Sequence, residues 1–209
     1  MELSIIIPAY NEEKYIERTL QRLQDVETIV VCNGCNDKTE EIAKKYSSNV
    51  LVLQEKGVSR ARNAGAKLAS HQRLVFMDAD ILPGKDVFEK IAASSHTVGT
   101  CKVKADSSFP FDKILMGIKS QFHRFGTCTG LLFLDKEVFD KVGGFEEHLS
   151  KKEDGRLLRR AMKEGHFGVV DGYIYNNMRR YRQKGYLAIG LYWIKEYLFP
   201  SKEEYESIR

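Results

Sequence analysis

The chain has 209 residues and a mass of 24.0 kDa, with 43% hydrophobic and 30% charged residues. This size and composition are typical of one soluble globular domain that buries its own core without disulfides or a second core. The formal net charge of +4, from 33 basic and 29 acidic residues, is too small to indicate nucleic-acid binding.

The chain ends and the cysteines predict a cytoplasmic protein. The first apolar run stops at Pro8 and has no basic segment before it, which is unlike an export signal. No stretch approaches the roughly 18 apolar residues of a spanning helix, since the nearest one, 186–199, contains Lys195 and Glu196. Cysteines without a secretory context are expected to be free thiols; they are Cys32, Cys35, Cys101 and Cys128.

Short β-rich runs alternate with helical patterns from residue 3 onward, which predicts βαβ units. The fold class is therefore α/β, with a mainly parallel central sheet flanked by helices in a single domain. The expected strands are 3–7, 28–32, 50–53 and 74–77. The expected helices lie near 15–23, from Asp37 onward with a capping box to Glu40, and at 59–70 with a small-residue face that allows close packing on the sheet.

After Asp80 the alternation is looser. Strands are expected at 97–103 and 131–134, and helices at 111–122, 136–142 and after Glu153, the last one stopping at Gly165. Residues 1–80 are interpreted as a nucleotide-binding half and 81–175 as the half that supplies the second substrate. Residues 176–209 are expected to form a helical extension.

The segment Asp78-Ala79-Asp80 follows a buried strand and places two carboxylates one residue apart. Such a strand end is where open α/β sheets bind ligands, and adjacent carboxylates are costly to bury unless they are paired or bound to metal. The pair predicts a hard divalent cation, Mg²⁺ or Mn²⁺, with phosphate oxygens on it. The alternative is an Asp-rich turn.

Two earlier strand ends also carry polar groups. Residues 8–13, Pro-Ala-Tyr-Asn-Glu-Glu, form either a pocket wall or a loop in which Asn11 caps the next helix. At the second strand end, the Asn33 amide is suited to a nucleobase edge. The Cys-x-x-Cys at 32–35 could instead indicate zinc or redox chemistry, although further zinc ligands and a thioredoxin-like context are absent from the sequence around it.

Charged residues gather at two expected helix starts. Lys56, Arg60 and Arg62 precede or open a helix, where they either join an anion or are solvated surface charge. Glu153 and Asp154 open another, where the simpler interpretation is a favourable interaction with the helix dipole. Neither phosphate-loop nor dinucleotide-binding glycine motifs follow any strand.

Taken in order, these segments resemble the family 2 inverting nucleotide-sugar glycosyltransferases of the GT-A fold, over roughly residues 3–170. The segments are 8–12, 33–39, 57–65, Asp78-Ala79-Asp80, Gly143-Gly144-Phe145, and Glu153-Asp154 followed by Leu157 and Arg160.

The resemblance implies transfer of a hexose-type sugar from a nucleotide diphosphate to an acceptor hydroxyl, with Asp154 as general base and Asp80 holding the metal. The donor nucleotide would contact Pro8, Ala9, Tyr10, Glu12, Asn33, Arg60 and Asp78. The sugar or acceptor would contact Gly144, Phe145 and Glu153. The acceptor is a glycan, a lipid-linked molecule or a small molecule, and no nucleic acid is expected.

Three features depart from this pattern or stay open. Cys32-Asn33 stand where the family usually has an acidic pair, and the late metal-binding His has no clear counterpart.

The basic and aromatic stretch 179–199 is interpreted as a peripheral contact with the inner membrane face, or as a helix packed on the domain or on a partner. A non-catalytic nucleotide-sugar-binding module and, less favoured, an Asp-x-Asp phosphatase are the alternative functions.

Overall fold

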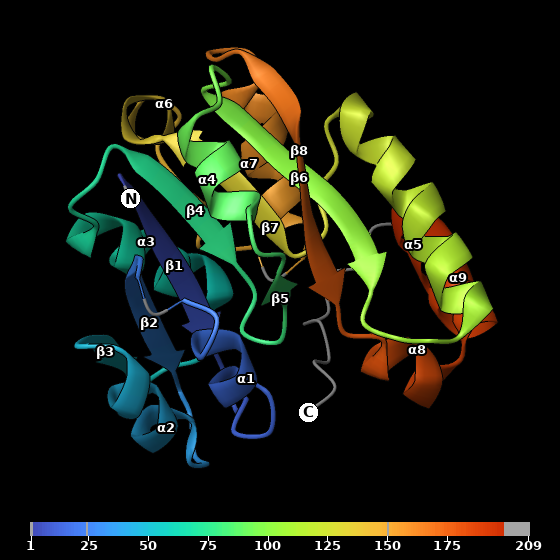
Figure 1. The fold of residues 1–209 in the computed structure, drawn as a ribbon, viewed down its shortest axis with the longest axis horizontal. Coiled ribbons are helices and arrows are strands. Elements are labelled where there is room, and N and C mark those ends of the chain that lie inside the picture. Colours follow the sequence, from blue (N-terminus) through green and yellow to red (C-terminus); the bar gives the residue numbers. More distant parts are fainter. Residues whose placement is uncertain (1, 24, 150, 199–209) are drawn as a thin grey trace.

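A curled eight-stranded sheet runs through the molecule in the order β3-β2-β1-β4-β7-β6-β8-β5 (Figure 1). The structure is a computed structural model that describes residues 2–23, 25–149 and 151–198, with side chains up to residue 192. The strands are β1 (Leu3–Ala9), β2 (Glu27–Asn33), β3 (Asn49–Leu53), β4 (Arg73–Met77), β5 (Leu82–Pro83), β6 (Val98–Ala105), β7 (Leu131–Asp135) and β8 (Phe167–Asn176).

The two halves of the sheet differ in strand direction. β1 to β4 pair in parallel, whereas β7 runs antiparallel to both β4 and β6. β8 is parallel to β6 and antiparallel to β5. The mainly parallel sheet predicted from the sequence therefore applies to the first half, and the second half is mixed. Because β1, β2 and β4 are parallel, the residues that follow them meet at one edge of the sheet.

Alternate side chains of each central strand enter two separate cores, as the two-residue period of a strand requires. In β1, Ile5 and Ile7 belong to one cluster and Ile6 to the other, and all three are fully buried. A strand that is buried on both faces reads as a continuous apolar run. This explains why the bounds predicted for β1, β2 and β4 agree closely with the observed ones.

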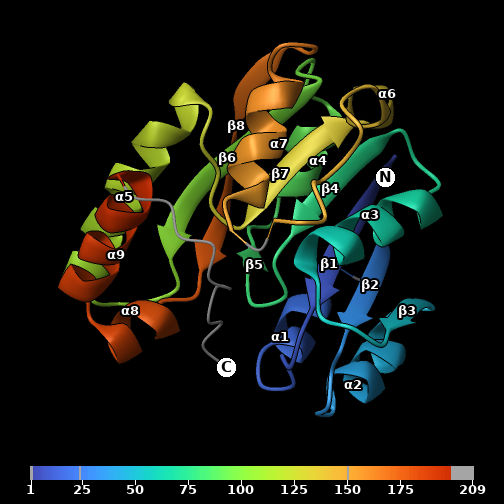
Figure 2. The same ribbon diagram turned by 180° about the vertical axis from the view of Figure 1, so that it is seen from behind.

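Helices cover both faces of the sheet (Figures 1 and 2). The face with Ile5 is covered by α1 (Ile16–Leu20), α2 (Thr39–Tyr46), α4 (Val87–Ala92), α5 (Pro110–Phe122), α8 (Arg179–Lys184) and α9 (Tyr186–Leu198). The face with Ile6 is covered by α3 (Val58–Leu68), α6 (Lys136–Lys141) and α7 (Glu153–Ala161). A short 3₁₀ helix, η1 (His123–Phe125), follows α5.

Helix α3 packs very close to the sheet, as its small-residue face predicts. A Cβ atom at Gly65 would lie 2.5 Å from Cγ2 of Ile6 and 3.2 Å from Cγ2 of Val31. Glycine is therefore required there for the close approach, and this approach brings the start of α3 to the carboxyl edge of the sheet.

The predicted capping box of α2 is only half formed. The helix begins at Thr39, whose N–H donates to the Asp37 carboxylate over 3.0 Å. Glu40 does not reach back to the cap and instead pairs with Lys44. The Thr39 hydroxyl accepts from the backbone N–H of Glu12 over 2.7 Å, so the start of α2 fixes the loop after β1.

The C-terminal stretch forms two helices rather than one. Gly185, with φ of +79°, separates α8 from α9. Among the described helices, none is long and apolar enough to cross a bilayer. Phe199, the predicted end of this stretch, lies outside the described residues, as do the side chains of Trp193, Ile194 and Tyr197. The four cysteines are free thiols, as predicted.

Candidate active site

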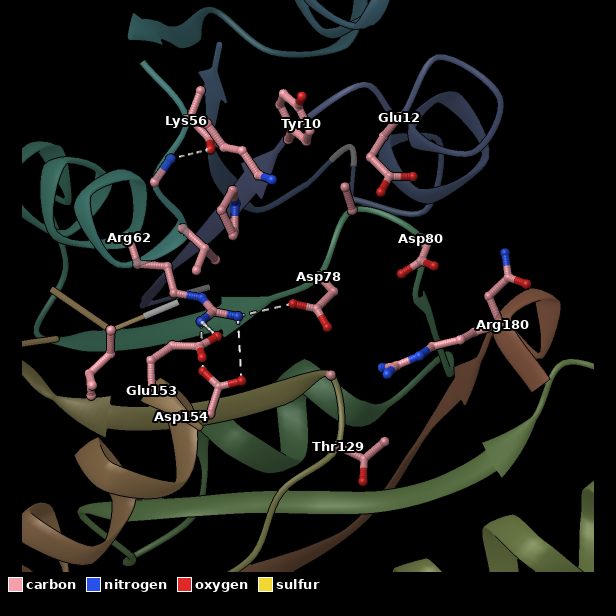
Figure 3. A pocket seen from close by; sticks show the side chains of 18 of the residues that line it. Tyr10, Glu12, Lys56, Arg62, Asp78, Asp80, Thr129, Glu153, Asp154 and Arg180 are labelled. Atoms are coloured by element: carbon pink, nitrogen blue, oxygen red, sulfur yellow. Dashed lines mark hydrogen bonds and ion pairs between the residues drawn. The ribbon is translucent and has the colours of Figure 1, made fainter. Parts of the chain in front are cut away.

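A cavity of about 760 Å³ opens at the carboxyl edge of β1, β2 and β4 (Figure 3). Both halves of the chain line it. The first half contributes Pro8, Tyr10, Glu12, Asn33, Lys56, Gly57, Val58, Arg60, Arg62, Asp78, Ala79 and Asp80. Residues 81–175 contribute Lys119, Thr129, Gly130, Glu147, His148, Leu149, Glu153 and Asp154, and the C-terminal extension contributes Asn176, Asn177, Arg179, Arg180 and Tyr181.

Arg62 of α3 holds three carboxylates together at one wall of the cavity (Figure 3). Its guanidinium lies 3.1 Å from Asp78, 2.9 Å from Glu153 and 2.7 Å from Asp154. The Arg62 side chain is only 4% exposed, and its guanidinium lies 5.1 Å from the centre of the Phe145 ring. A buried cation requires such partners, so α3 and α7 are linked through charge at the cavity.

One guanidinium does not neutralise three carboxylates, and the pKa values reflect the excess. Burial raises the pKa of Asp154 to about 7; Arg62 opposes the shift, and Glu153 and Asp78 add to it. Partial burial and the neighbouring Asp80 and Glu153 raise the pKa of Asp78 as well, against the effect of Arg62. Asp154 is therefore poised to exchange a proton near neutral pH.

The second acidic residue of the Asp-x-Asp segment belongs to a different group. Nη2 of Arg179, at the start of α8, lies 3.0 Å from Oδ2 of Asp80 and 2.9 Å from Oε1 of Glu12. The guanidinium also lies 4.2 Å from the centre of the Tyr15 ring. Arg179 thus joins the loop after β1, the Asp-x-Asp segment and the C-terminal helices at one point.

The protein residues that could hold a divalent ion are few. In the part of the chain that the structure describes, no cluster of three or more His, Cys, Asp or Glu side chains could ligate a metal. An ion on Asp80 would take its remaining ligands from donor phosphates and water, which Mg²⁺ and Mn²⁺ accept. It would also have to share Asp80 with Arg179. The carboxylate chemistry fits the predicted ion, with Asp80 as its one assigned protein ligand.

The wall after β1 and β2 is tied together by Asn33. Its amide nitrogen donates to the carbonyl of Ala9 over 2.8 Å, and its amide oxygen accepts from the backbone N–H of Gly57 over 3.0 Å. Lys56 lies over the Tyr10 ring, with Nζ 5.0 Å from the ring centre. The Asn33 amide thus fixes three loops, and its predicted contact with a nucleobase would have to be made alongside these bonds.

Most of the residues predicted for the site do line the cavity. They are Pro8, Tyr10, Glu12, Asn33, Arg60, Asp78, Asp80, Glu153 and Asp154. Ala9, Gly144 and Phe145 do not. Phe145 is 2% exposed and makes a T-shaped contact with the ring of Phe76. The Arg62 guanidinium lies over the Phe145 ring. The predicted contact of Phe145 with a sugar or acceptor is therefore corrected. Phe145 is buried, and it supports the Arg62 side chain that lines the cavity.

No site role was predicted for Arg179 or Arg180, and Arg62 was predicted only to join an anion or to be solvated surface charge. Arg62 appeared as one of several cations near a helix start, and its burial could not be read from helical spacing. Arg179 and Arg180 were grouped with the C-terminal basic and aromatic stretch, and both line the cavity. Figure 3 shows the Arg180 side chain directed into the cavity on the side of Asp80.

Comparison with known proteins finds similarity to one family of glycosyltransferases. Residues 4–101 match the family model described as glycosyl transferase family 2. Glycosyltransferase AglE of Haloferax volcanii is 28% identical over 189 residues, which cover 78% of this chain and 62% of the relative. A dolichol-phosphate mannosyltransferase of Pyrococcus furiosus is 30% identical over 165 residues, covering 69% of this chain and 45% of the relative. The chain thus spans less than two thirds of either relative.

Solved structures show the same fold. S. aureus TarS in complex with UDP-GlcNAc superimposes with a TM-score of 0.71 at 24% identity, covering 86% of this chain and 59% of TarS. The mannosyltransferase PcManGT from Pyrobaculum calidifontis, in complex with GDP-Man and Mn²⁺, gives 0.63 at 21% identity, covering 81% and 56%. The fold is that of the GT-A glycosyltransferases. Over residues 4–101, just under half of its length, the chain is similar to glycosyl transferase family 2.

Proposed function

We propose that the protein transfers a hexose-type sugar from a nucleotide diphosphate to an acceptor hydroxyl, with inversion at the anomeric carbon. Asp154 is the general base and Asp80 binds a divalent ion, Mg²⁺ or Mn²⁺. The observation that carries the proposal is the Arg62 group, which gathers Asp154, Glu153 and Asp78 at the wall of a cavity that also contains Asp80. The family match and the sugar-nucleotide complexes of its structural neighbours support it.

Asp154 removes the proton of the acceptor hydroxyl while that oxygen forms a bond to the anomeric carbon. The bond from this carbon to the donor diphosphate breaks, and its electron pair leaves with the diphosphate. A base with a pKa near the working pH is well suited to this transfer, and the pKa of Asp154 is raised to about 7. Arg62 acts as a positioning residue, because it fixes the Asp154 carboxylate without reaching the reacting atoms.

The ion on Asp80, when bound, supplies positive charge to the departing diphosphate. Arg179 and Arg180 add permanent positive charge on the same side of the cavity, where guanidinium groups suit phosphate oxygens. The wall made by residues 1–80 would hold the nucleotide through Pro8, Tyr10 and Arg60. The wall made by residues 81–175, with Lys119 and Thr129, would receive the acceptor.

A thermal-shift panel of UDP- and GDP-sugars, with and without Mn²⁺, tests donor binding, since a ligand raises stability by mass action. Metal-dependent donor hydrolysis then tests turnover. Asp154→Asn should lower turnover by about 10² to 10⁴ while the donor-induced shift is retained. Glu147→Gln is the matched control, because Glu147 lines the same cavity but binds Asn63 instead of Arg62.

Each contrary outcome has a definite meaning. Unchanged turnover in Asp154→Asn would refute its role as the base. Donor binding by the wild type without any turnover would indicate a non-catalytic nucleotide-sugar-binding module. Hydrolysis of a phosphomonoester in place of a sugar nucleotide would indicate a phosphatase, the function that the family match disfavours.

A further inference from the structure

Helix α5 is apolar on its outer side as well as its inner side. Met116 is fully buried against the sheet layer, as expected for a packed helix. On the outer side, Phe111, Ile114, Ile118 and Phe122 are each 47–60% exposed. Their spacing of three and four residues puts them on one line along the helix. A packed helix normally shows polar residues on that side, so this stripe calls for an explanation.

The apolar surface extends beyond the helix at both ends. Phe109 precedes α5 and is 55% exposed, and Phe125 in η1 is 67% exposed. These two residues with Phe111, Ile114, Ile118 and Phe122 make up what we call the α5 stripe. Helix α9 overlaps α5 in Figures 1 and 2, and the ring of its Tyr186 lies 4.9 Å from that of Phe111. Leu187 and Leu191 of α9 are also exposed. Exposed apolar residues gathered on one line in this way are typical of an interaction site.

Within the chain segment that carries the stripe, the exposed charged side chains have one sign. Between residues 107 and 126 the exposed charged side chains are Lys113 and Arg124. The single acid of this segment, Asp112, is fully buried and bonded to Tyr186 and Arg182. A surface that combines aromatic and aliphatic side chains with cations, and no exposed acid, matches an anionic lipid interface.

We propose that the α5 stripe docks on an anionic lipid bilayer, with the helix lying in the plane of the interface. The apolar side chains enter the boundary between headgroups and acyl chains, and Lys113 and Arg124 contact lipid phosphates. A second copy of the chain is a poorer occupant. A symmetric pairing along the stripe would bring Lys113 and Arg124 of both copies together, with no exposed acid in this segment to balance them.

The position of α5 also links this surface to the cavity. Lys119, on the inner side of α5, lines the cavity and donates to the Tyr181 hydroxyl over 2.9 Å. Docking through the stripe on the same helix would hold the acceptor side of the cavity next to the bilayer. If the proposed transfer is correct, this arrangement suits an amphiphilic acceptor whose apolar part stays in the membrane. This last step rests on the proposed function, whereas the docking itself does not.

Sedimentation with vesicles of phosphatidylglycerol and of phosphatidylcholine tests the docking on the full chain. The wild type should bind the anionic vesicles and bind the zwitterionic ones much more weakly. Ile114→Glu combined with Ile118→Glu should weaken binding at least about tenfold. Leu68→Glu is the matched control, because Leu68 is 54% exposed on α3, away from the stripe, and its variant should bind like the wild type.

The donor-induced thermal shift, measured without vesicles, should be the same in all these variants, which separates this test from that of the proposed function. Lys113→Glu with Arg124→Glu should reduce binding to anionic vesicles only. The proposal is overturned if the wild type fails to bind anionic vesicles, or if the isoleucine pair binds as well as Leu68→Glu. It is also overturned if sedimentation equilibrium shows a dimer that the isoleucine pair dissociates while vesicle binding stays unchanged.

Discussion

Replacing Arg62 with Met removes the cation that holds the acidic wall of the cavity. Met has a similar length and is apolar, so it can fill the space against Phe145, which lies 5.1 Å from the guanidinium. The carboxylates of Asp78, Glu153 and Asp154 are then left without their shared partner. We expect the variant to fold with a lower free energy of unfolding and to lose more stability as the pH rises.

The magnitude follows from the burial of the ion pairs. Breaking a fully buried pair costs about 3–5 kcal/mol. Here the Asp78 and Asp154 side chains are 44% and 28% exposed, so water screens part of the charge that remains. We therefore expect a loss near the lower end, about 3 kcal/mol at pH 8.

The pH dependence has a definite sign. The pKa of Asp154 is already raised from 3.8 to about 7 in the folded protein, and it rises further once Arg62 is gone. The folded state then binds more protons than the unfolded state between these values, so stability falls as the pH rises from about 4 to about 7. The destabilisation by Arg62→Met should therefore be smaller at about pH 5 than at about pH 8.

Urea denaturation of wild type and variant at both pH values measures this difference. Arg60→Met is the matched control, since Arg60 lies on the same helix but is 46% exposed and pairs with the exposed Glu55. Its stability should stay close to that of the wild type. A loss in Arg62→Met that is equal at both pH values, or no larger than in the control, would refute the charge argument.

Three further predictions concern the base, the ion and the packing of α3. Donor turnover should rise with pH through about 7, because the deprotonated form of Asp154 is the one that accepts a proton. Arg179→Met should tighten Mn²⁺ binding measured by titration calorimetry without donor, since Asp80 loses a competing cation 3.0 Å away. Gly65→Ala should lower the free energy of unfolding by about 1–3 kcal/mol in urea, because the added methyl meets Ile6.

Each of these has a result that would contradict it. A turnover that falls with pH in this range would exclude Asp154 as the base. For the ion, Arg182→Met is the control, because Arg182 is also on α8 but is 57% exposed and pairs with Asp112. Equal Mn²⁺ affinities in the two arginine variants and the wild type would show that Arg179 does not compete. A Gly65→Ala variant as stable as the wild type would mean that α3 moves away freely.

The first half of the fold could be predicted because its strands are buried on both faces. The strand predicted at 74–77 is observed at Arg73–Met77, and the strand predicted at 28–32 is observed at Glu27–Asn33. Continuous apolar runs of this length leave little ambiguity. The second half offered weaker signals. β8 was not assigned, and its pairing with β6 contains a register shift at Cys101 and Lys102 that breaks the regular alternation.

The carboxylates of the site could be predicted, but not their partners. Asp78 and Asp80 follow a strand that the pattern locates, so their place at the sheet edge follows from topology. Arg62 binds Glu153, which lies 91 residues further along the chain. The periodicity of a sequence does not predict contacts between residues so far apart. Arg179 was grouped with a basic and aromatic stretch, for which a membrane contact and a helix packed on the domain or on a partner were both left open. Helical spacing places the α5 stripe residues on one side of the helix, but it does not tell whether that side is buried or exposed.

The bond between Arg179 and Glu12 joins positions 167 residues apart. During synthesis the last strand, β8, ends at Asn176, so the whole sheet has been made before Arg179 leaves the ribosome. A nascent chain at that stage holds Glu12 and Asp80 without the cation that later lies between them. The donor side therefore cannot be complete before α8 has been synthesised, however early the first strands pair.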